Sequence, residues 1–492
     1  MVNTQVALES RIVRLQDICG LLQKHPALFC NPATTLPVRF PVHHAINTKA
    51  ARPVYMASRC RSPLGQQQIQ AAVHDMLQRG IIEPSNSAWV SEPHLVRKED
   101  GSFRFCIDFR QLNKVTVHDK YPLPRVDDLL DTLGKSHYFS SLDLASGYWQ
   151  IPLRQEDRHK TAFRAPNGLF QFCRMPFGLS DAGSTFQRMA HTIFADLIQK
   201  GVVVVYLDDI LVHTQTWPRH LEVLDAVLCR ITQYNLQLQF RKCRWGCTEL
   251  KFLGYVISAS GVRMDPSKIV AVINYLPPST VKSLQHFLGL VIFSLRFMPN
   301  LAAITYPLRH LLRKQVHYQW TVACQQSFER VKELIQSRTV LAHPDFNKPF
   351  RIHTDASNQG LGAALLQLDD NLQLRPVAFI SRALSSSETN YSTTEKEFLA
   401  IVWAFQRFHP YVHGSPVVVE TDHKPLLGLL LKSHPPGRLL RWALALQEYT
   451  FTLEYRQGMK NTIADSLSRT EHQAVQYTPP TLALPLTAEQ LA

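Results

Sequence analysis

Two adjacent aspartates, Asp208 and Asp209, stand between two apolar, mostly β-branched runs, residues 202–206 and 210–212. Runs of this kind on either side of a short polar step predict a β-hairpin. Because neighbouring side chains of a strand point to opposite faces, both carboxylates can serve one site only if they lie at or beside the turn. There they repel each other unless a cation offsets their charge. An Asp-Asp pair in a polar turn is common, so the pair alone is more often a solvated turn than a site.

A third carboxylate, Asp143, lies inside a second predicted strand, residues 139–144, whose other side chains are apolar or small. A lone carboxylate in such a setting is costly to bury. Packed beside the hairpin, it would complete a set of oxygen ligands of the kind that Mg²⁺ prefers. Two such ions, about 3.5–4 Å apart, can activate a 3′-hydroxyl group and neutralise a leaving pyrophosphate. The three aspartates therefore predict a site for phosphoryl transfer.

Three further acids are widely spaced in the last part of the chain. Asp355 and Asp422 each end a run that predicts a strand, and two glycines follow Asp355 within seven residues. Asp465 stands at the start of a short predicted helix. Each acid by itself is more often a surface or capping residue than a ligand.

Glu397 belongs to a predicted helix that opens with a capping box, Ser392 followed three residues later by Glu395. On a helical wheel, Glu397 lines up with the apolar residues 401, 404, 405 and 408. Glu395 points about 160° away from Glu397, toward solvent. Glu397 is therefore the better candidate for a buried ligand.

The composition is that of a folded, basic protein of several domains. The chain has 492 residues, with 53 Lys and Arg against 39 Asp and Glu. The excess of positive charge favours an anionic partner, nucleic acid before a membrane surface. No apolar run approaches the roughly 18 residues that span a bilayer, and the first 20 residues lack a signal-peptide pattern. Nine scattered cysteines indicate a reducing compartment, and Cys243 with Cys247 lacks the second pair of a zinc finger.

The positive charge is concentrated in residues 241–314. This stretch holds eleven Lys and Arg against two acids, so it carries +9 of the chain's +14. We expect a largely helical segment that grips a phosphate backbone, with a solvated basic face as the alternative.

The residues around the hairpin aspartates resemble a known family. Residues 206–209 (Tyr-Leu-Asp-Asp) look like the Tyr-x-Asp-Asp motif of reverse transcriptases, and residues 40–470 are similar to the Pol polyprotein of gypsy-type LTR retrotransposons. The four distal acids resemble the Asp-Glu-Asp-Asp set of ribonuclease H (RNase H). Further segments match the family in its order: residues 104–113, 121–124, 139–144, 160–163, 175–179, 252–255 and 287–290.

The resemblance implies an α+β fold: a right-hand polymerase with fingers, palm and thumb, followed by an RNase H-like mixed-sheet α/β domain. The implied division is an N-terminal extension, fingers and palm, a basic and mainly helical thumb or connection, the RNase H-like domain and a disordered tail. These parts would cover residues 1–50, 51–257, 258–342, 345–470 and 471–492.

The resemblance also implies residue roles. Asp143 and Asp208 would hold the metals of the first site with support from Asp209. The second site would use Asp355, Glu397, Asp422 and Asp465 for metal-assisted hydrolysis of RNA paired with DNA. Nucleotide contacts would come from Arg104 at the triphosphate, Arg97 or Lys98 beside it, Tyr148 under the sugar, Phe177 and Gly178 in the pocket, and Lys242 at the phosphates. For Tyr148 the alternative is an aromatic of the protein core.

The implied activity is RNA-directed and DNA-directed DNA synthesis with RNase H cleavage, using two Mg²⁺ ions per site, with Mn²⁺ as the alternative ion. Partners would be an RNA template, a DNA primer strand, an RNA–DNA hybrid, dNTPs and a tRNA or other RNA primer. We expect no membrane partner and a cytoplasmic location within virus-like particles, and the oligomeric state stays open. Because protease and integrase signatures are missing, we expect a product or fragment of a longer polyprotein.

Two departures from the family pattern leave the aspartates intact. The family usually has Asn-Ala-Pro-Ala where residues 181–184 read Asp-Ala-Gly-Ser, which loosens a helix start unless Asp181 caps it. A Tyr-Arg pair is usual where this chain has Phe293 and Ser294. The first alternative function is a decayed or domesticated element that binds nucleic acid without catalysis, against which the intact carboxylates argue. A repair nuclease and a capsid-type protein explain fewer of the motifs.

Overall fold

The computed structural model describes residues 2–29, 42–58, 60–97, 101, 103–337, 339–426 and 437–455. The chain forms two compact units, Met1–Leu253 and Gly254–Ala492. The border lies four residues before the expected end of the fingers and palm, and the finer division stays a prediction. In the described part of the chain, no helix has the length and apolar character needed to cross a membrane.

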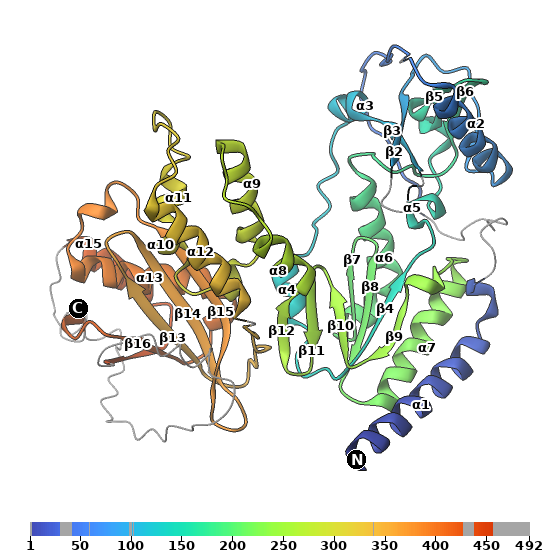
Figure 1. The fold of residues 1–492 in the computed structure, drawn as a ribbon. Coiled ribbons are helices and arrows are strands. Elements are labelled where there is room, and N and C mark those ends of the chain that lie inside the picture. The colour runs from blue at the N-terminus through green and yellow to red at the C-terminus, as the bar shows by residue number, and fades with distance from the viewer. Residues whose placement is uncertain are drawn as a thin grey trace. The chain divides into compact units, whose positions relative to one another are not determined.

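The first unit is built on a four-stranded sheet of order β7-β8-β4-β9. Its strands are β7 (Val203–Tyr206), β8 (Asp209–Thr214), β4 (Tyr138–Asp143) and β9 (Arg244–Cys247). Two amphipathic helices, α6 (Ala182–Gln199) and α7 (Trp217–Gln233), pack against it (Figure 1). The apolar faces of these helices and the inner faces of the strands form one buried core. This core fixes the positions of the polar residues at the strand ends.

Smaller elements of the first unit form two further sheets and share its buried core. The strands β2 (Glu92–Arg97) and β3 (Phe103–Asp108) are an antiparallel hairpin, and the other sheet has the order β1-β6-β5. The remaining elements of the unit up to residue 172 are β1 (Ile82–Pro84), β5 (Phe163–Ala165), β6 (Gly168–Phe172), α2 (Pro63–Gln78), α3 (Arg110–Val115), α4 (Val126–Asp131), α5 (Gly147–Gln150) and η2 (Gln155–Thr161).

The chain begins with helix α1 (Val2–Gln23) and the short helix η1 (Pro26–Phe29), which contact α7 (Figure 1). Within α1, Ile18 and Leu21 are buried, whereas Ile12 and Leu15 are more than half exposed. The last turns of α1 therefore make apolar contact with the rest of the unit.

The second unit opens with the antiparallel hairpin β11 (Tyr255–Ser258) and β12 (Gly261–Met264) and continues with helices around a core centred on Phe287 and Phe328. The basic segment is mainly helical from residue 266 on. Before that, Arg241 and Lys242 lie in the short helix η3 (Phe240–Lys242), whereas Arg244, Lys251 and Arg263 lie on strands, so the expected helical structure is absent at these three bases. Besides this hairpin and β9, the helices and strands of residues 240–336 are η3 (Phe240–Lys242), β10 (Glu249–Phe252), α8 (Pro266–Ile273), α9 (Val281–Ile292), η4 (Leu295–Phe297), α10 (Leu301–Ile304), α11 (Tyr306–His310) and α12 (Val322–Gln336).

A five-stranded mixed sheet of order β15-β14-β13-β16-β17 forms the rest of the second unit. Its first three strands pair antiparallel, while β13 with β16 and β16 with β17 pair parallel. Helix α13 (Thr393–Val412) packs on the sheet and against α15 (Gly437–Leu446). The other bounds are β13 (Phe350–Ala356), β14 (Gly360–Leu368), β15 (Leu374–Ala383), η5 (Glu388–Asn390), β16 (Val417–Thr421) and β17 (Phe451–Tyr455).

Candidate active sites

The first pair of aspartates lies at the tip of the predicted hairpin. Strand β7 ends at Tyr206, which pairs with Asp209 at the start of β8. Leu207 and Asp208 form the two-residue connection, and Leu207 has a φ of 50°. The structure thus confirms that both carboxylates lie at or beside the turn.

A buried glutamine that the sequence analysis missed holds this turn. Gln187 of α6 donates its side-chain amide to the Val205 carbonyl at 2.9 Å and accepts from the Leu207 N–H at 2.8 Å. Both backbone groups lie beside the hairpin tip, where ladder bonds end. Gln187 is therefore the residue that fixes the strained backbone under the aspartates, and its place in a Thr-Phe-Gln segment was the available signal.

Asp143 comes from the neighbouring strand and meets the hairpin directly. In the β4–β8 pair, Asp143 stands opposite Asp209. Residues directly opposite in an antiparallel pair have Cα atoms about 4.5–5.5 Å apart, so the two carboxylates share one end of the sheet. The expected convergence of Asp143 with the hairpin pair is thus present.

The raised pKa values of the hairpin aspartates also indicate that the three carboxylates lie close together. Burial, followed by the charges of Asp209 and Asp143, raises the pKa of Asp208 to about 6. Burial and Asp143 also raise the pKa of Asp209. Lys242 opposes this from 3.6 Å, the distance from its Nζ to Asp143 Oδ2. Partly buried carboxylates that repel one another and offer only oxygen atoms are a donor set that fits hard divalent cations.

The residues expected to contact a nucleotide fall into two groups. Tyr148 lies in the first group, with its ring centroid 5.0 Å from Phe177 and 5.7 Å from Phe186. Burial and the charge of Asp208 raise its pKa to about 12, so the hydroxyl lies within electrostatic reach of the hairpin. Phe177 is 45% exposed, which leaves a free aromatic face beside Tyr148.

Gly178 follows with a φ of 96°, a backbone conformation that favours glycine. The Asn113 side chain donates to the Gly178 carbonyl at 2.9 Å and accepts from the Ser180 N–H at 3.0 Å. Asn113 therefore fixes the loop that carries Phe177, a role that the sequence analysis did not assign.

The second group lies on the β2–β3 hairpin. Arg97 and Arg104 are both exposed there, and Val96 pairs with Arg104 across the two strands. No contact recorded among the described residues joins either arginine to the aspartates, so their triphosphate role stays a prediction. Lys98 lies outside the described residues.

The departure at residues 181–184 does not prevent helix α6 from beginning at Ala182. Asp181 occupies the N-cap position, the alternative that the sequence left open, but its side chain makes no capping hydrogen bond; its carboxylate lies 3.3 Å from His118 Nδ1. A Cβ added to Gly183 would lie 3.1 Å from Leu207 Cδ2. The glycine thus lets the helix start approach the hairpin tip.

Cys243, one of the two cysteines weighed as a zinc pair, lies beside strand β4. Cys243 is buried, and its sulfur accepts from the Asp143 N–H at 3.5 Å. The cysteine therefore lies under the strand end that carries Asp143.

The second set of acids meets at one end of the mixed sheet. Asp355 is the last but one residue of β13, and Asp422 follows β16 directly. His353 pairs with Glu420 in the parallel register, so two residues further along the same register Asp355 lies beside Asp422. The two predicted strand-end acids are thus neighbours.

Glu397 completes this set from helix α13, which begins with the predicted capping box of Ser392 and Glu395. Glu397 is only 5% exposed, and its Oε2 atom has no hydrogen-bond partner among the described residues. Burial, then the charges of Asp422 and Asp355, raise its pKa to about 8. A buried carboxylate oxygen without a partner beside two other acids fits a cation ligand. Asp465 lies outside the described residues.

A contact from outside the sheet reaches the same acids. Asn300, which precedes α10, donates its side-chain amide to Asp355 Oδ2 at 3.1 Å. This bond partly opposes burial and Asp422, which raise the pKa of Asp355. The added Cβ of any larger residue at Gly362 would overlap the Asn300 side-chain oxygen. Nothing in the sequence pattern pointed to this contact.

Comparison with known families matches both halves of the chain. Residues 96–257 match the family described as reverse transcriptase (RNA-dependent DNA polymerase), and residues 320–419 match the RNase H-like domain found in reverse transcriptase. The first match contains all three polymerase-site aspartates, and the second contains Asp355 and Glu397.

Curated proteins that are similar to this chain include Pol polyproteins of Drosophila melanogaster transposons. The chain is 36% identical to that of transposon opus, over 96% of this chain and 49% of the relative. It is 37% identical to that of transposon 297, over 92% and 42%, and 33% identical to that of transposon gypsy, over 92% and 45%. The chain therefore spans about half the length of these relatives or less.

Solved structures support the fold. A foamy viral protease–reverse transcriptase in complex with double-stranded DNA superposes with a TM-score of 0.80, at 22% identity, over 90% of this chain and 94% of that chain. The same kind of protein in complex with an RNA/DNA hybrid gives 0.73 at 22% identity, over 95% and 63%. The α+β polymerase architecture followed by an RNase H-like mixed sheet is thus confirmed.

Proposed function

We propose that this chain copies RNA into DNA and hydrolyses the copied RNA. The premise is that it carries a reverse transcriptase domain followed by an RNase H-like domain, both related to those of gypsy-type Pol polyproteins. One observation carries the polymerase half: Asp143 stands opposite Asp209 across two paired strands, with Asp208 at the adjoining turn. The buried Glu397 beside Asp355 and Asp422 supports the second half.

In the first site, Asp143, Asp208 and Asp209 would hold two divalent cations, Mg²⁺ or Mn²⁺. The bound ions would lower the pKa of the primer 3′-hydroxyl and stabilise the charge on the leaving pyrophosphate. Lys242, whose Nζ lies 3.6 Å from Asp143 Oδ2, would face the phosphates of the incoming dNTP. Tyr148 and Phe177 offer a packed aromatic surface on which the sugar would rest, which would exclude a 2′-hydroxyl.

In the second site, Asp355, Glu397 and Asp422 would hold the cations, and Asp465 is proposed as the fourth acid. Water would attack the RNA phosphodiester, and the 2′-hydroxyl and minor-groove shape would mark the RNA strand of the hybrid. Glu397, whose pKa is near neutrality, would hold a proton until the site takes up a cation.

The proposed partners are an RNA template, a DNA primer strand, an RNA–DNA hybrid and dNTPs, with a tRNA or another RNA as the first primer. The foamy viral structures hold double-stranded DNA or an RNA/DNA hybrid, which supports the nucleic-acid partners. The resemblance to retrotransposon polyproteins further suggests action in the cytoplasm within virus-like particles.

A single reaction on a labelled RNA template with a DNA primer tests both halves. Asp208→Asn should abolish primer extension and leave cleavage of a preformed hybrid near the wild-type rate, because the second site keeps its acids. Asp355→Asn should do the reverse. A wild-type protein that binds the hybrid but neither extends nor cleaves it would show a nucleic-acid binder without catalysis and would overturn the proposal.

A further inference from the structure

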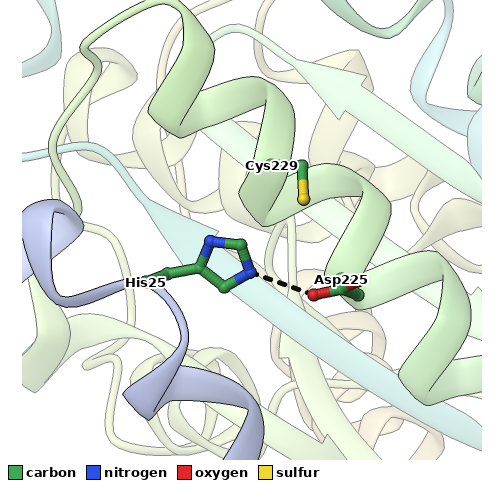
Figure 2. Close-up of side chains that lie close together, drawn as sticks. All are labelled: His25, Asp225 and Cys229. Atoms are coloured by element: carbon green, nitrogen blue, oxygen red, sulfur yellow. Dashed lines mark hydrogen bonds and ion pairs between the residues drawn. The ribbon is translucent and has the colours of Figure 1, made fainter.

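Three side chains of different chemistry meet where the segment after α1 reaches helix α7, and none of them belongs to either set of acids. Figure 2 shows His25 directed at Asp225, with Cys229 on the same side of α7. His25 Nε2 lies 3.0 Å from Asp225 Oδ1, and the ligand atoms of all three residues lie within 4.8 Å of one another. Within the residues that the structure describes, no other three His, Cys, Asp or Glu side chains meet so closely.

The spacing on α7 is that of a paired ligand site. Asp225 and Cys229 are four residues apart, so they lie one turn apart on the same helix face. Imidazole nitrogen, thiolate sulfur and carboxylate oxygen are together the ligand types of Zn²⁺, whereas Mg²⁺ and Ca²⁺ take oxygen ligands. Ligand atoms around a tetrahedral Zn²⁺ are about 3.3–3.7 Å apart, given bond lengths of about 2.0–2.3 Å. The His25–Asp225 distance of 3.0 Å is shorter than this range and the other two distances do not exceed 4.8 Å, so the three ligand atoms lie near the spacing that Zn²⁺ needs.

The burial of the three residues suits such a site. His25 is buried, Asp225 is partly exposed and Cys229 is exposed, so the side open to solvent belongs to the two α7 ligands. Three protein ligands leave a fourth position open to water.

We propose that His25, Asp225 and Cys229 form a zinc site that clips the segment after α1 to helix α7. Asp17 accepts from the Trp217 indole N–H at 2.8 Å, and Ile18, Leu21 and Leu28 are buried in the same core as the apolar face of α7. A metal site across this junction would add a cross-link to that packing.

The clip would act on the strand end that carries Asp143. The Leu28 carbonyl in η1 accepts from the Leu238 N–H at 3.1 Å, and the next residue, Gln239, donates its N–H to the Asp143 carbonyl at 2.8 Å. Ordering the segment from His25 to Leu28 would therefore stabilise the backbone on which Asp143 stands. This consequence does not depend on what reaction Asp143 performs.

The competing interpretation is a plain ion pair of His25 and Asp225, in which Cys229 is a bystander. Cys229 separates the two, because an ion pair does not need the thiol. An exposed cysteine is also a safe site for substitution, since no core contact is lost. Cys60, exposed and part of a different segment, provides the matched control.

The test uses the full chain, stripped of metal and kept reduced by a phosphine, with excess Mg²⁺ to occupy the carboxylate sites. Added Co²⁺ should give a thiolate-to-cobalt absorption band in the wild type and in Cys60→Ser, and the band should be absent in Cys229→Ser. Zn²⁺ should raise the thermal midpoint of the wild type and Cys60→Ser only. Cys229→Ser should weaken Zn²⁺ binding at least about a hundredfold, since loss of a mere outer-shell partner already costs 10–100-fold.

His25→Gln and Asp225→Asn should each reduce Zn²⁺ affinity in the same titration. The proposal is overturned if the wild type shows no thiolate band, or if Cys229→Ser keeps both the band and the thermal shift. The ion pair is established instead if the thermal midpoint falls in the His25 and Asp225 variants but changes neither on addition of Zn²⁺ nor in Cys229→Ser.

Discussion

Glu397 is the residue whose surroundings oppose its charge most strongly among the second set of acids. It is buried, faces Asp355 and Asp422, and has a pKa raised from 4.5 to about 8. Between these two pH values the folded protein holds a proton that the unfolded chain has lost. Raising the pH across this window therefore lowers the free energy of unfolding, by at most about 1.4 kcal/mol per pH unit.

Glu397→Gln removes this cost, because the amide does not ionise. Without divalent ions, the variant should match the wild type near pH 4.5 and become increasingly more stable than it up to about pH 8. Urea denaturation at several pH values in a metal chelator measures the difference. Glu395→Gln is the control: Ser392 and Arg438 lower the pKa of Glu395, so its loss should destabilise above pH 4.5. A Glu397→Gln curve parallel to the wild-type curve would contradict the expectation.

Tyr148 illustrates a residue for which the two sequence interpretations both find support. Its ring packs between Phe177 and Phe186, as a core aromatic would, yet its hydroxyl feels the charge of Asp208. If the ring excludes the 2′-hydroxyl, Tyr148→Ala should raise ribonucleotide incorporation relative to dNTP by at least about tenfold, since about 1.4 kcal/mol of lost discrimination suffices. Tyr148→Phe keeps the ring and should keep the selectivity. Competitive primer extension with matched rNTP and dNTP decides, and unchanged selectivity in Tyr148→Ala assigns the ring to packing.

At the scale of elements, the sequence predicted those features that local pattern determines. The hairpin around Asp208 and the capping box before Glu397 are both written within a few consecutive residues, and both are present. The contacts of Gln187 and Asn300 could not be predicted this way. Each joins segments whose spacing depends on how separate elements pack, which periodicity does not encode.

The segment of η4 and α10 packs beside the acids of the mixed sheet. Asn300 has a φ of 51° and donates to Asp355, while the Ala302 N–H donates to the Ser381 hydroxyl at 3.0 Å. The segment is thus anchored on β15 independently of Asn300. A change of the Asn300 side chain should therefore affect Asp355 without detaching the segment.

Asn300→Gly tests this contact, because glycine accepts the left-handed backbone and removes the whole side chain, the amide donor included. Without the donor, the Asp355 carboxyl should have a higher pKa and a less fixed orientation, so cleavage of an RNA–DNA hybrid should fall by about tenfold at neutral pH, a loss of about 1.4 kcal/mol. Asn300→Asp should cost more, since it adds a like charge. Primer extension is the internal control and should not change. Cleavage at the wild-type rate, with an unshifted pH profile, would show that Asn300 only packs.

At the scale of the whole molecule, the sequence predicted the acids of both sites but only roughly the elements that carry the positive charge. The expected basic segment is real as a stretch of sequence, yet its bases lie on strands and turns as well as on helices. Helical and extended segments can present Lys and Arg equally well, so net charge predicts a nucleic-acid partner without predicting the fold that carries it.

The charge of this segment leads to a prediction about binding. If it contacts about six phosphates, affinity for an RNA–DNA hybrid should fall roughly thousandfold between about 50 and 200 mM salt, because each neutralised phosphate releases counterions. Changing the exposed Lys268, Lys282 and Lys314 together to Gln should flatten the logarithmic salt slope by about one unit for each lysine that touches a phosphate. Fluorescence anisotropy with a labelled hybrid at fixed Mg²⁺ measures the slope. The control changes three exposed bases outside the segment, Lys200, Arg219 and Arg407, and should lower the net charge equally without the same loss of slope. Equal slopes in both triple variants would mean that the whole surface attracts the hybrid and that residues 241–314 do not grip it.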